Sequence, residues 1–270
     1  MADKNDSTYQ KKVSDYYDTD ARLGFESRAN ANPLLDKIRS DFRQITTKFG
    51  FSNALEIGCG PGFDLQWFAN RFPAENITGV DISEEMVKLA RARIRETGLE
   101  NALVLQSDEK QLTEHFHPAG FDLVYVYFGA LNTVEDLARS AQSIHELLKP
   151  GGHAVLTFVN KWYIREMLVQ LLKGRIKSAF ARLRKFWGGY SPERYLPSKC
   201  YSPGQVRDAF RNFKLLERKG YSIFFPAWYN YPRFKRKEKK LEKLWSFDQK
   251  LQGTFLWSMG EYTLFVFRKE

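Results

Sequence analysis

The residues best suited to chemistry form a glycine-rich turn that directly follows an apolar run. The run Ala54–Ile57 leads into the turn, which contains Gly58, Gly60 and Gly62. Glycines let the backbone approach a ligand where a side chain would collide, and the start of the next helix adds oriented N–H groups. Because Phe63 occupies the position of the third glycine in a dinucleotide fingerprint, the spacing disfavours NAD. No Lys-Ser/Thr pair follows, which disfavours a P-loop.

Two acidic residues follow the next two apolar runs, near the point where each run ends. Asp81 comes directly after Ile77–Val80, and Asp108 comes shortly after Ala102–Leu105. At the carboxyl edge of a parallel sheet, Asp81 can accept both hydrogen bonds of a ribose diol, and Asp108 can accept one from an adenine amino group. The alternatives are helix capping for Asp81, a role for which Ser83 competes, and capping or solvent contact for Asp108.

Short apolar runs alternate with amphipathic segments, a pattern typical of a parallel sheet with crossover helices. Besides the runs already named, the expected strands are Phe121–Tyr127, Ala154–Val159, Tyr221–Phe225 and Tyr262–Phe267. Two helical patterns in residues 1–50 predict an N-terminal cap. Further helices are expected at Pro203–Phe210 and Arg233–Leu251.

In combination, the motifs of residues 12–160 resemble those of the class I S-adenosylmethionine-dependent methyltransferases, and among these the small-molecule enzymes of type 11/25. The motifs are Glu-x-Gly-x-Gly-x-Gly from Glu56, Gly-Val-Asp-Ile-Ser at 79–83, Ser-Asp at 107–108, Phe-Asp-Leu-Val at 121–124 and Leu-Lys-Pro-Gly-Gly at 148–152. Ser107 departs from the family pattern, because many relatives have glycine there. The resemblance implies an α/β, Rossmann-like seven-stranded sheet of order 3-2-1-4-5-7-6 with strand seven antiparallel.

The same resemblance, together with the element pattern, divides the chain into four parts. Residues 1–50 are expected to form an N-terminal helical cap, and residues 51–160 the S-adenosylmethionine-binding core. Residues 161–200 follow strand five as a basic helical lid insertion. Residues 201–270 are expected to complete the sheet and to add a basic helix.

The resemblance implies S-adenosyl-L-methionine as cofactor, with S-adenosyl-L-homocysteine as product. The predicted cofactor-binding residues are Tyr17, Arg28, Glu56, Gly58, Cys59, Gly60, Gly62, Asp81, Ile82, Met86, Ser107, Asp108, Glu109 and Tyr127. The predicted acceptor-pocket residues are Tyr16, Phe25, Phe128, Asn132, Asn160 and Tyr163. Ordinary core packing is the alternative for the N-terminal aromatic residues, and turn formation is the alternative for Asn132.

Methyl transfer from a sulfonium is an in-line displacement, so positioning and exclusion of water are the main tasks, and a dedicated base is optional. The sequence assigns no catalytic residue. Asp122 and His153 begin strands and are expected at the end of the sheet away from the cofactor.

His115 and His117 lack a third plausible ligand nearby, so we predict no metal site. No Asn/Asp-Pro-Pro-Tyr/Phe tetrapeptide is present, which removes the most direct evidence for a DNA or protein-glutamine methylase.

The basic character of the chain belongs to its second half, because residues 151–270 carry a net charge of +16 and residues 1–150 carry −6. The stretch Arg165–Trp187 predicts a basic amphipathic helix, with Arg182, Arg184 and Lys185 as membrane-contact candidates. A lid over the acceptor pocket is the favoured interpretation, and contact with an anionic membrane or with nucleic acid are the alternatives. The cluster Arg233–Lys240 fits a solvated helix face or phosphate binding.

The leading hypothesis is therefore methyl transfer to an oxygen, nitrogen or carbon atom of a small or lipid-like metabolite. The alternatives are an RNA methyltransferase that uses the basic half and a non-catalytic S-adenosylmethionine-binding protein. No apolar run approaches the roughly 18 residues of a membrane span, and Cys59 and Cys200 are expected as reduced thiols. These features predict a cytoplasmic protein, with peripheral contact at an anionic membrane as an alternative. The sequence specifies neither the acceptor nor the oligomeric state.

Overall fold

A single seven-stranded sheet of order β3-β2-β1-β4-β5-β7-β6 forms the centre of the molecule. The structure is a computed structural model that describes residues 3–108, 111–191 and 193–270. The strands are β1 Asn53–Ile57, β2 Asn76–Asp81, β3 Ala102–Gln106, β4 Phe121–Val126, β5 Leu148–Val159, β6 Phe213–Tyr221 and β7 Tyr262–Lys269. β7 pairs antiparallel with both β5 and β6, and the other pairs are parallel. The predicted fold class is confirmed.

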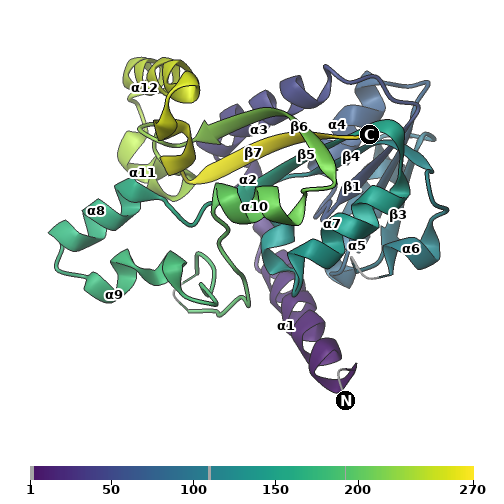
Figure 1. Ribbon diagram of the computed structural model, residues 1–270, viewed down its shortest axis with the longest axis horizontal. Coiled ribbons are helices and arrows are strands. Elements are labelled where there is room, and N and C mark those ends of the chain that lie inside the picture. The colour runs from purple at the N-terminus through teal and green to yellow at the C-terminus, as the bar shows by residue number, and fades with distance from the viewer. Residues whose placement is uncertain (1–2, 109–110, 192) are drawn as a thin grey trace.

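Helices surround the sheet, and the N-terminal helix and the helices that follow β5 extend away from it (Figure 1). The α-helices are α1 Asp3–Arg22, α2 Phe25–Asn30, α3 Pro33–Thr46, α4 Phe63–Arg71, α5 Glu84–Glu96, α6 Leu112–His115, α7 Leu137–Leu147, α8 Ile164–Leu172, α9 Ile176–Ala179, α10 Pro203–Ala209, α11 Tyr231–Phe234 and α12 Glu238–Lys250. Local sequence explains several of the starts. The Asn32 side chain accepts hydrogen bonds from the Leu34 and Leu35 N–H groups and caps α3, whose first residue is Pro33.

The two faces of the sheet carry separate apolar layers, because successive strand residues point to opposite sides. On one face, α3, α4 and α5 bury side chains such as Phe42, Phe68 and Ala90. On the other face, α7 and α10 bury Ile144 and Val206. Both layers hold the carboxyl ends of β1, β2 and β4 in fixed positions, which is where the glycine turn and its neighbours lie.

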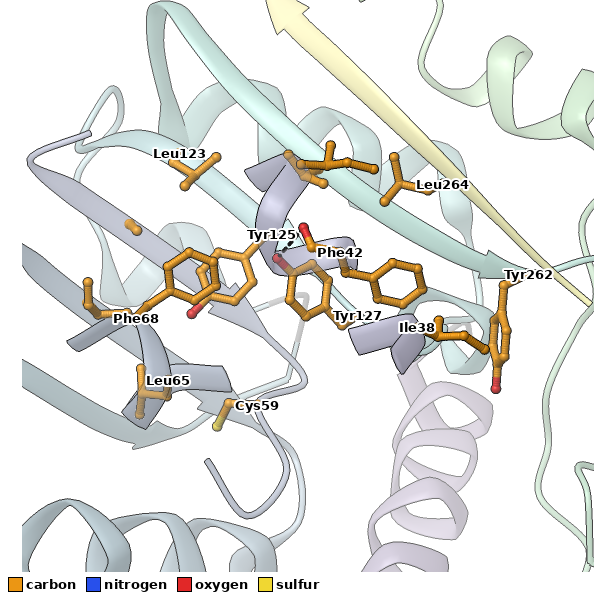
Figure 2. Packing of buried hydrophobic residues seen from close by; sticks show 14 of the residues in the cluster. Ile38, Phe42, Cys59, Leu65, Phe68, Leu123, Tyr125, Tyr127, Tyr262 and Leu264 are labelled. Atoms are coloured by element: carbon orange, nitrogen blue, oxygen red, sulfur yellow. Dashed lines mark hydrogen bonds between the residues drawn. The ribbon is translucent and has the colours of Figure 1, made fainter. Parts of the chain in front are cut away.

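Aromatic side chains fill the layer between α3, α4 and the sheet (Figure 2). Tyr125 lies 4.8 Å from Phe68 and Tyr127 lies 5.4 Å from Phe42, measured between ring centroids. The Tyr127 hydroxyl donates to the Phe42 carbonyl over 3.3 Å, so this buried polar group has a partner. Packing of this kind fixes the strand ends that carry the candidate site.

The strand predicted at Tyr221–Phe225 is wrong, since β6 ends at Tyr221. The Asp248 carboxylate of α12 accepts the backbone N–H groups of Ile223, Phe224 and Phe225 at 2.7–3.2 Å. These donors therefore bond to a side chain instead of a neighbouring strand. Ser222, with φ of +58°, turns the chain out of the sheet.

Three predicted helical stretches are divided in the structure. The cap contains α1, α2 and α3 instead of two helices, with a break at Gly24, whose φ is +79°. The basic stretch Arg165–Trp187 forms the two short helices α8 and α9, separated at Gly174 with φ of +68°. The stretch 233–251 is interrupted before α12, where Arg236 has φ of +69°. Positive φ is incompatible with a continuous α-helix.

Candidate active site

The three glycines of the turn have positive φ values, but their surroundings differ. A β-carbon at Gly58 would lie 2.4 Å from the β-carbon of Ala130, and one at Gly62 would lie 3.0 Å from that of Ala90. A β-carbon at Gly60 would meet no atom within 4 Å. Gly58 and Gly62 therefore allow close packing of protein against protein, whereas Gly60 leaves open space at the wall of a cavity.

Asp81 lies at the end of β2, beside this open space. Its carboxylate oxygens accept the Gly60 N–H at 2.8 Å and the Ser83 N–H at 2.9 Å. Burial raises the pKa of Asp81 to about 6, and the two N–H groups act in the opposite direction. The cap of α5 is Ser83, whose hydroxyl accepts the Met86 N–H at 3.1 Å. The capping role is thus filled by Ser83, and Asp81 faces the cavity.

Glu56 is also buried at the floor of the cavity, and the Tyr125 hydroxyl donates to it over 3.1 Å. Burial, and after it the nearby Asp64 carboxylate, raises the pKa of Glu56 well above its usual range. Asp64 is itself paired with two arginines of α3, at 3.3 Å to Arg39 and 2.6 Å to Arg43. Arg39 lines the cavity and was not identified from the sequence, because only the fold brings α3 against the glycine turn.

The cavity measures about 610 Å³ and joins the glycine turn to the inner side of the cap. The sequence-predicted residues that line it are Tyr16, Tyr17, Phe25, Arg28, Glu56, Gly58, Cys59, Gly60, Asp81, Ile82, Met86, Ser107, Asp108, Tyr127, Phe128 and Asn132. Gly62, Asn160 and Tyr163 lie outside the lining, and Glu109 lies outside the described residues. The volume is in the range of small-molecule sites.

Residues 54–152 match a family model described as a methyltransferase domain. A ubiquinone biosynthesis O-methyltransferase from Xylella fastidiosa is 28% identical over 134 residues, which cover 50% of this chain and 52% of that relative. This chain thus spans about half the length of that curated relative. Together with the glycine turn, Asp81 and the strand order, these matches identify one part of the chain. Residues 54–152 form a methyltransferase domain of the class I, S-adenosylmethionine-dependent type.

Solved structures share the fold of this chain over nearly its whole length. The N-methyltransferase NodS from Bradyrhizobium japonicum, in complex with S-adenosyl-L-homocysteine, has a TM-score of 0.59 at 16% identity, covering 96% of this chain and 98% of that chain. The [4+2]-cyclase SpnF has a TM-score of 0.63 at 20% identity, covering 95% and 94%. At these identities the likeness concerns the fold alone.

The N-terminal helix is fastened over the cavity by polar contacts. Asp18 of α1 accepts the Ser83 hydroxyl at 2.6 Å and the Glu85 N–H at 3.1 Å, next to the strand end that carries Asp81. Asp20, which is buried, pairs with both Arg28 and Arg194. Because Arg194 belongs to the insertion after β5, Asp20 connects the cap to the insertion.

Aromatic residues from three distant segments form a wall of the same cavity: Trp187, Tyr190, Trp228 and Tyr262. None of them was predicted individually as a site residue. Trp228 lies in the stretch Tyr221–Tyr231, whose aromatic composition favours an acceptor pocket, with base stacking as the alternative, whereas the other three have no local motif. The wall gives the cavity a large apolar surface with a few hydroxyl and indole groups.

Three predicted pocket residues have their hydrogen bonds satisfied within the protein or lie behind the wall. The Asn132 amide donates to the Val159 carbonyl at 3.1 Å and its oxygen accepts the Val159 N–H at 2.9 Å. Asn160 donates to the carbonyls of Ser258 and Gly260 at 2.7 and 2.8 Å. Tyr163 is buried under the Arg182 guanidinium, 5.1 Å from the ring centroid. Asn160 and Tyr163 therefore belong to the scaffold around the cavity, whereas Asn132 lines the cavity with its amide group bonded to Val159.

The expected surface position of Arg182 is wrong, because only 3% of this residue is exposed. Its guanidinium stacks on Trp187 and Tyr190 and its Nε donates to Glu166 at 2.8 Å.

Among the described residues no group of three or more histidine, cysteine, aspartate or glutamate side chains is arranged to hold a metal ion. No helix of the described segments is long and apolar enough to cross a membrane. Cys59 and Cys200 are buried free thiols.

Proposed function

We propose that this chain transfers a methyl group from S-adenosylmethionine to a small molecule held between the glycine turn and the aromatic wall. The observation that carries the proposal is that Gly60, Asp81 and the aromatic wall line one cavity. The residues fit the cofactor: open space lies over Gly60, and the Asp81 carboxylate beside it is the acceptor that a ribose diol needs.

When bound, S-adenosylmethionine supplies an electrophilic methyl group on a positively charged sulfur. The residues of the chain would hold the two reactants and keep water out. Asp81 would accept the ribose hydroxyls, and Asp108 would face the adenine end. The rings of Tyr16 and Tyr17 line the cap side of the cavity, where aromatic faces favour a positive charge. Such positioning is the main requirement for an in-line displacement.

We infer that the acceptor is an aromatic or lipid-like small molecule. The aromatic wall supports this class, and so does the similarity to a protein named for O-methylation in ubiquinone biosynthesis. The similarity to a cyclase of the same fold means that binding and methyl transfer need separate tests.

Binding is tested by calorimetry with S-adenosylhomocysteine. Wild type is expected to bind in the micromolar range, and Asp81→Ala should weaken binding about tenfold or more, because it removes hydrogen bonds to a charged acceptor. Asp208→Ala, which changes an exposed carboxylate on α10, is the matched control and should leave affinity unchanged. Absence of binding by wild type would refute the proposed function.

A further inference from the structure

A buried carboxylate lies directly behind the aromatic wall of the cavity. Glu261 precedes β7 and is 0% exposed. Its Oε1 accepts the Tyr190 hydroxyl at 2.8 Å, whereas its Oε2 has no hydrogen-bond partner within the described part of the chain. A buried carboxylate oxygen without a partner costs free energy, so the position calls for an explanation beyond packing.

The hydroxyl groups of Tyr190 and Tyr262 connect the Glu261 carboxylate to the cavity. Tyr190 and Tyr262 both line the cavity, and their hydroxyl oxygens are 3.2 Å apart. Tyr262 also hydrogen-bonds to the Trp228 side chain, whose indole N–H can only donate. The Tyr190 hydroxyl lies within hydrogen-bond distance of both Glu261 and Tyr262, so the side chains of Trp228, Tyr262, Tyr190 and Glu261 form one continuous hydrogen-bonded series.

Opposing charges surround Glu261. Burial raises the pKa of Glu261 to about 7, while Arg182 and the Tyr190 hydrogen bond lower it and Glu166 raises it. The other charged or titratable groups facing this position are Arg165, Tyr163, Tyr229 and Tyr262.

The position of Glu261 is set by main-chain pairing. The Asn160 N–H donates to the Glu261 carbonyl at 2.8 Å, where β5 ends and β7 begins. The Asn160 side chain donates to Gly260, the residue before it, at 2.8 Å. These bonds fix the main chain at Glu261, and the Tyr190 hydrogen bond directs its side chain toward the wall.

We propose that Tyr190, backed by Glu261, accepts the proton of a hydroxyl group on an aromatic acceptor. The inference rests on the proposed function and names its substrate class. Tyr190 would be the catalytic residue, because it lines the cavity, and Glu261 acts through it as a positioning residue and proton store. An aromatic hydroxyl fits because its ring can pack against the wall formed with Trp187 and Trp228.

The step balances without any further reactant. The acceptor O–H bond breaks, and its electron pair forms the new bond from oxygen to the methyl carbon. The pair of the broken bond between sulfur and the methyl carbon stays on sulfur. The acceptor proton moves to the Tyr190 oxygen as the original Tyr190 proton moves to Glu261, which becomes neutral. After the product leaves, Glu261 returns a proton to Tyr190, and Tyr190 releases one to water in the cavity.

One test observes Glu261 directly and needs no acceptor. Infrared difference spectra of wild type against Glu261→Gln should show a protonated carboxyl band that disappears as the pH rises through about 7. Tyr190→Phe removes one hydrogen bond to the charged form, so the same band should persist to higher pH. No difference band between pH 5 and 9 would overturn the proposal.

A second test uses catechol and 4-nitrocatechol as acceptor probes with radiolabelled S-adenosylmethionine. Wild type should methylate at least one of them, and kcat should fall as the pH decreases through about 7. Glu261→Gln and Tyr190→Phe should each lower kcat about 100-fold and remove this pH dependence, with KM changed less than about threefold. Glu238→Gln, on the exposed surface of α12, is the matched control with wild-type kinetics.

The outcomes separate this proposal from the proposed function. If wild type binds S-adenosylhomocysteine but methylates neither probe, the assignment of an aromatic hydroxyl acceptor is wrong. If both variants keep the wild-type kcat and pH profile, the proton path is wrong. If Glu261→Gln does not fold, Tyr190→Phe, which removes a single oxygen atom, decides the question alone. Failure of wild type to bind S-adenosylhomocysteine contradicts the proposed function instead.

Discussion

Asp81 combines two features that oppose each other. Backbone N–H groups of Gly60 and Ser83 favour its ionised form, whereas burial favours the neutral form and raises its pKa to about 6. The carboxylate is therefore held in one orientation, yet it is close to neutralisation under mildly acidic conditions. A ligand whose hydroxyl groups donate to Asp81 needs the ionised form.

Cofactor affinity should consequently depend on pH. Above pH 7 Asp81 is ionised and would accept both ribose hydroxyls in the proposed complex, and as the pH falls through about 6 it gains a proton and loses an acceptor site. We expect the Kd of S-adenosylhomocysteine to be about tenfold higher at pH 5 than at pH 7.5, measured by calorimetry. Asp81→Asn should bind weakly at both values, with a nearly flat profile. Equal pH dependence in wild type and Asp81→Asn would assign the effect to another group.

At the scale of elements, the cap and the insertion are connected through one buried side chain. Asp20 of α1 pairs with Arg28, at 2.8 Å, and with Arg194 of the insertion. The Tyr9 hydroxyl adds a second connection, donating to the Pro197 carbonyl at 2.7 Å. These contacts hold two segments that are far apart in the sequence over the same cavity.

Breaking this connection should loosen the cover without affecting the sheet. Asp20→Ala leaves Arg194 and Arg28 without their shared carboxylate, so α1 should open more often. We expect S-adenosylhomocysteine to dissociate about tenfold faster, and hydrogen exchange in α1 to accelerate, while exchange in β1 and β4 stays unchanged. Asp15→Ala, on the exposed side of the same helix, serves as control. Unchanged dissociation in Asp20→Ala would show that α1 does not retain the ligand.

The elements also show why one half of the site could be predicted and the other could not. The glycine turn and Asp81 depend on neighbouring residues and on strand ends, so their spacing in the sequence carries the signal. The aromatic wall joins Tyr190, Trp228 and Tyr262, which only the completed fold brings together. Similarly, the Asp248 carboxylate accepts the backbone N–H groups of residues 223–225, which lie far from it in the sequence. The apolar run alone therefore predicted a strand there.

At the scale of the whole molecule, the insertion presents an unusual outer surface. Figure 1 shows α8 and α9 extending away from the sheet. Leu172 is 88% exposed and Ile176 is 64% exposed, and both lie beside exposed basic residues, among them Arg175 and Lys177. Apolar side chains bordered by positive charge are complementary to an anionic lipid surface, where they can leave water while the charges meet headgroups. A lipid-like acceptor would be concentrated at such a surface.

This arrangement predicts that the protein binds anionic vesicles through α8 and α9. Wild type should float with vesicles of phosphatidylglycerol and phosphatidylcholine, and much less with phosphatidylcholine alone. Leu172→Ser with Ile176→Ser should weaken binding about tenfold or more by removing apolar contact, and Arg175→Ala with Lys177→Ala should do so by removing charge. Leu216→Ser, at an exposed apolar residue of β6, is the control that should float like wild type. Equal flotation of all variants would exclude this surface as the membrane contact. If the protein does not float but retains RNA at physiological salt, nucleic acid is favoured as the partner of the basic half. Retention at that salt concentration is informative because attraction to phosphate alone weakens steeply with salt.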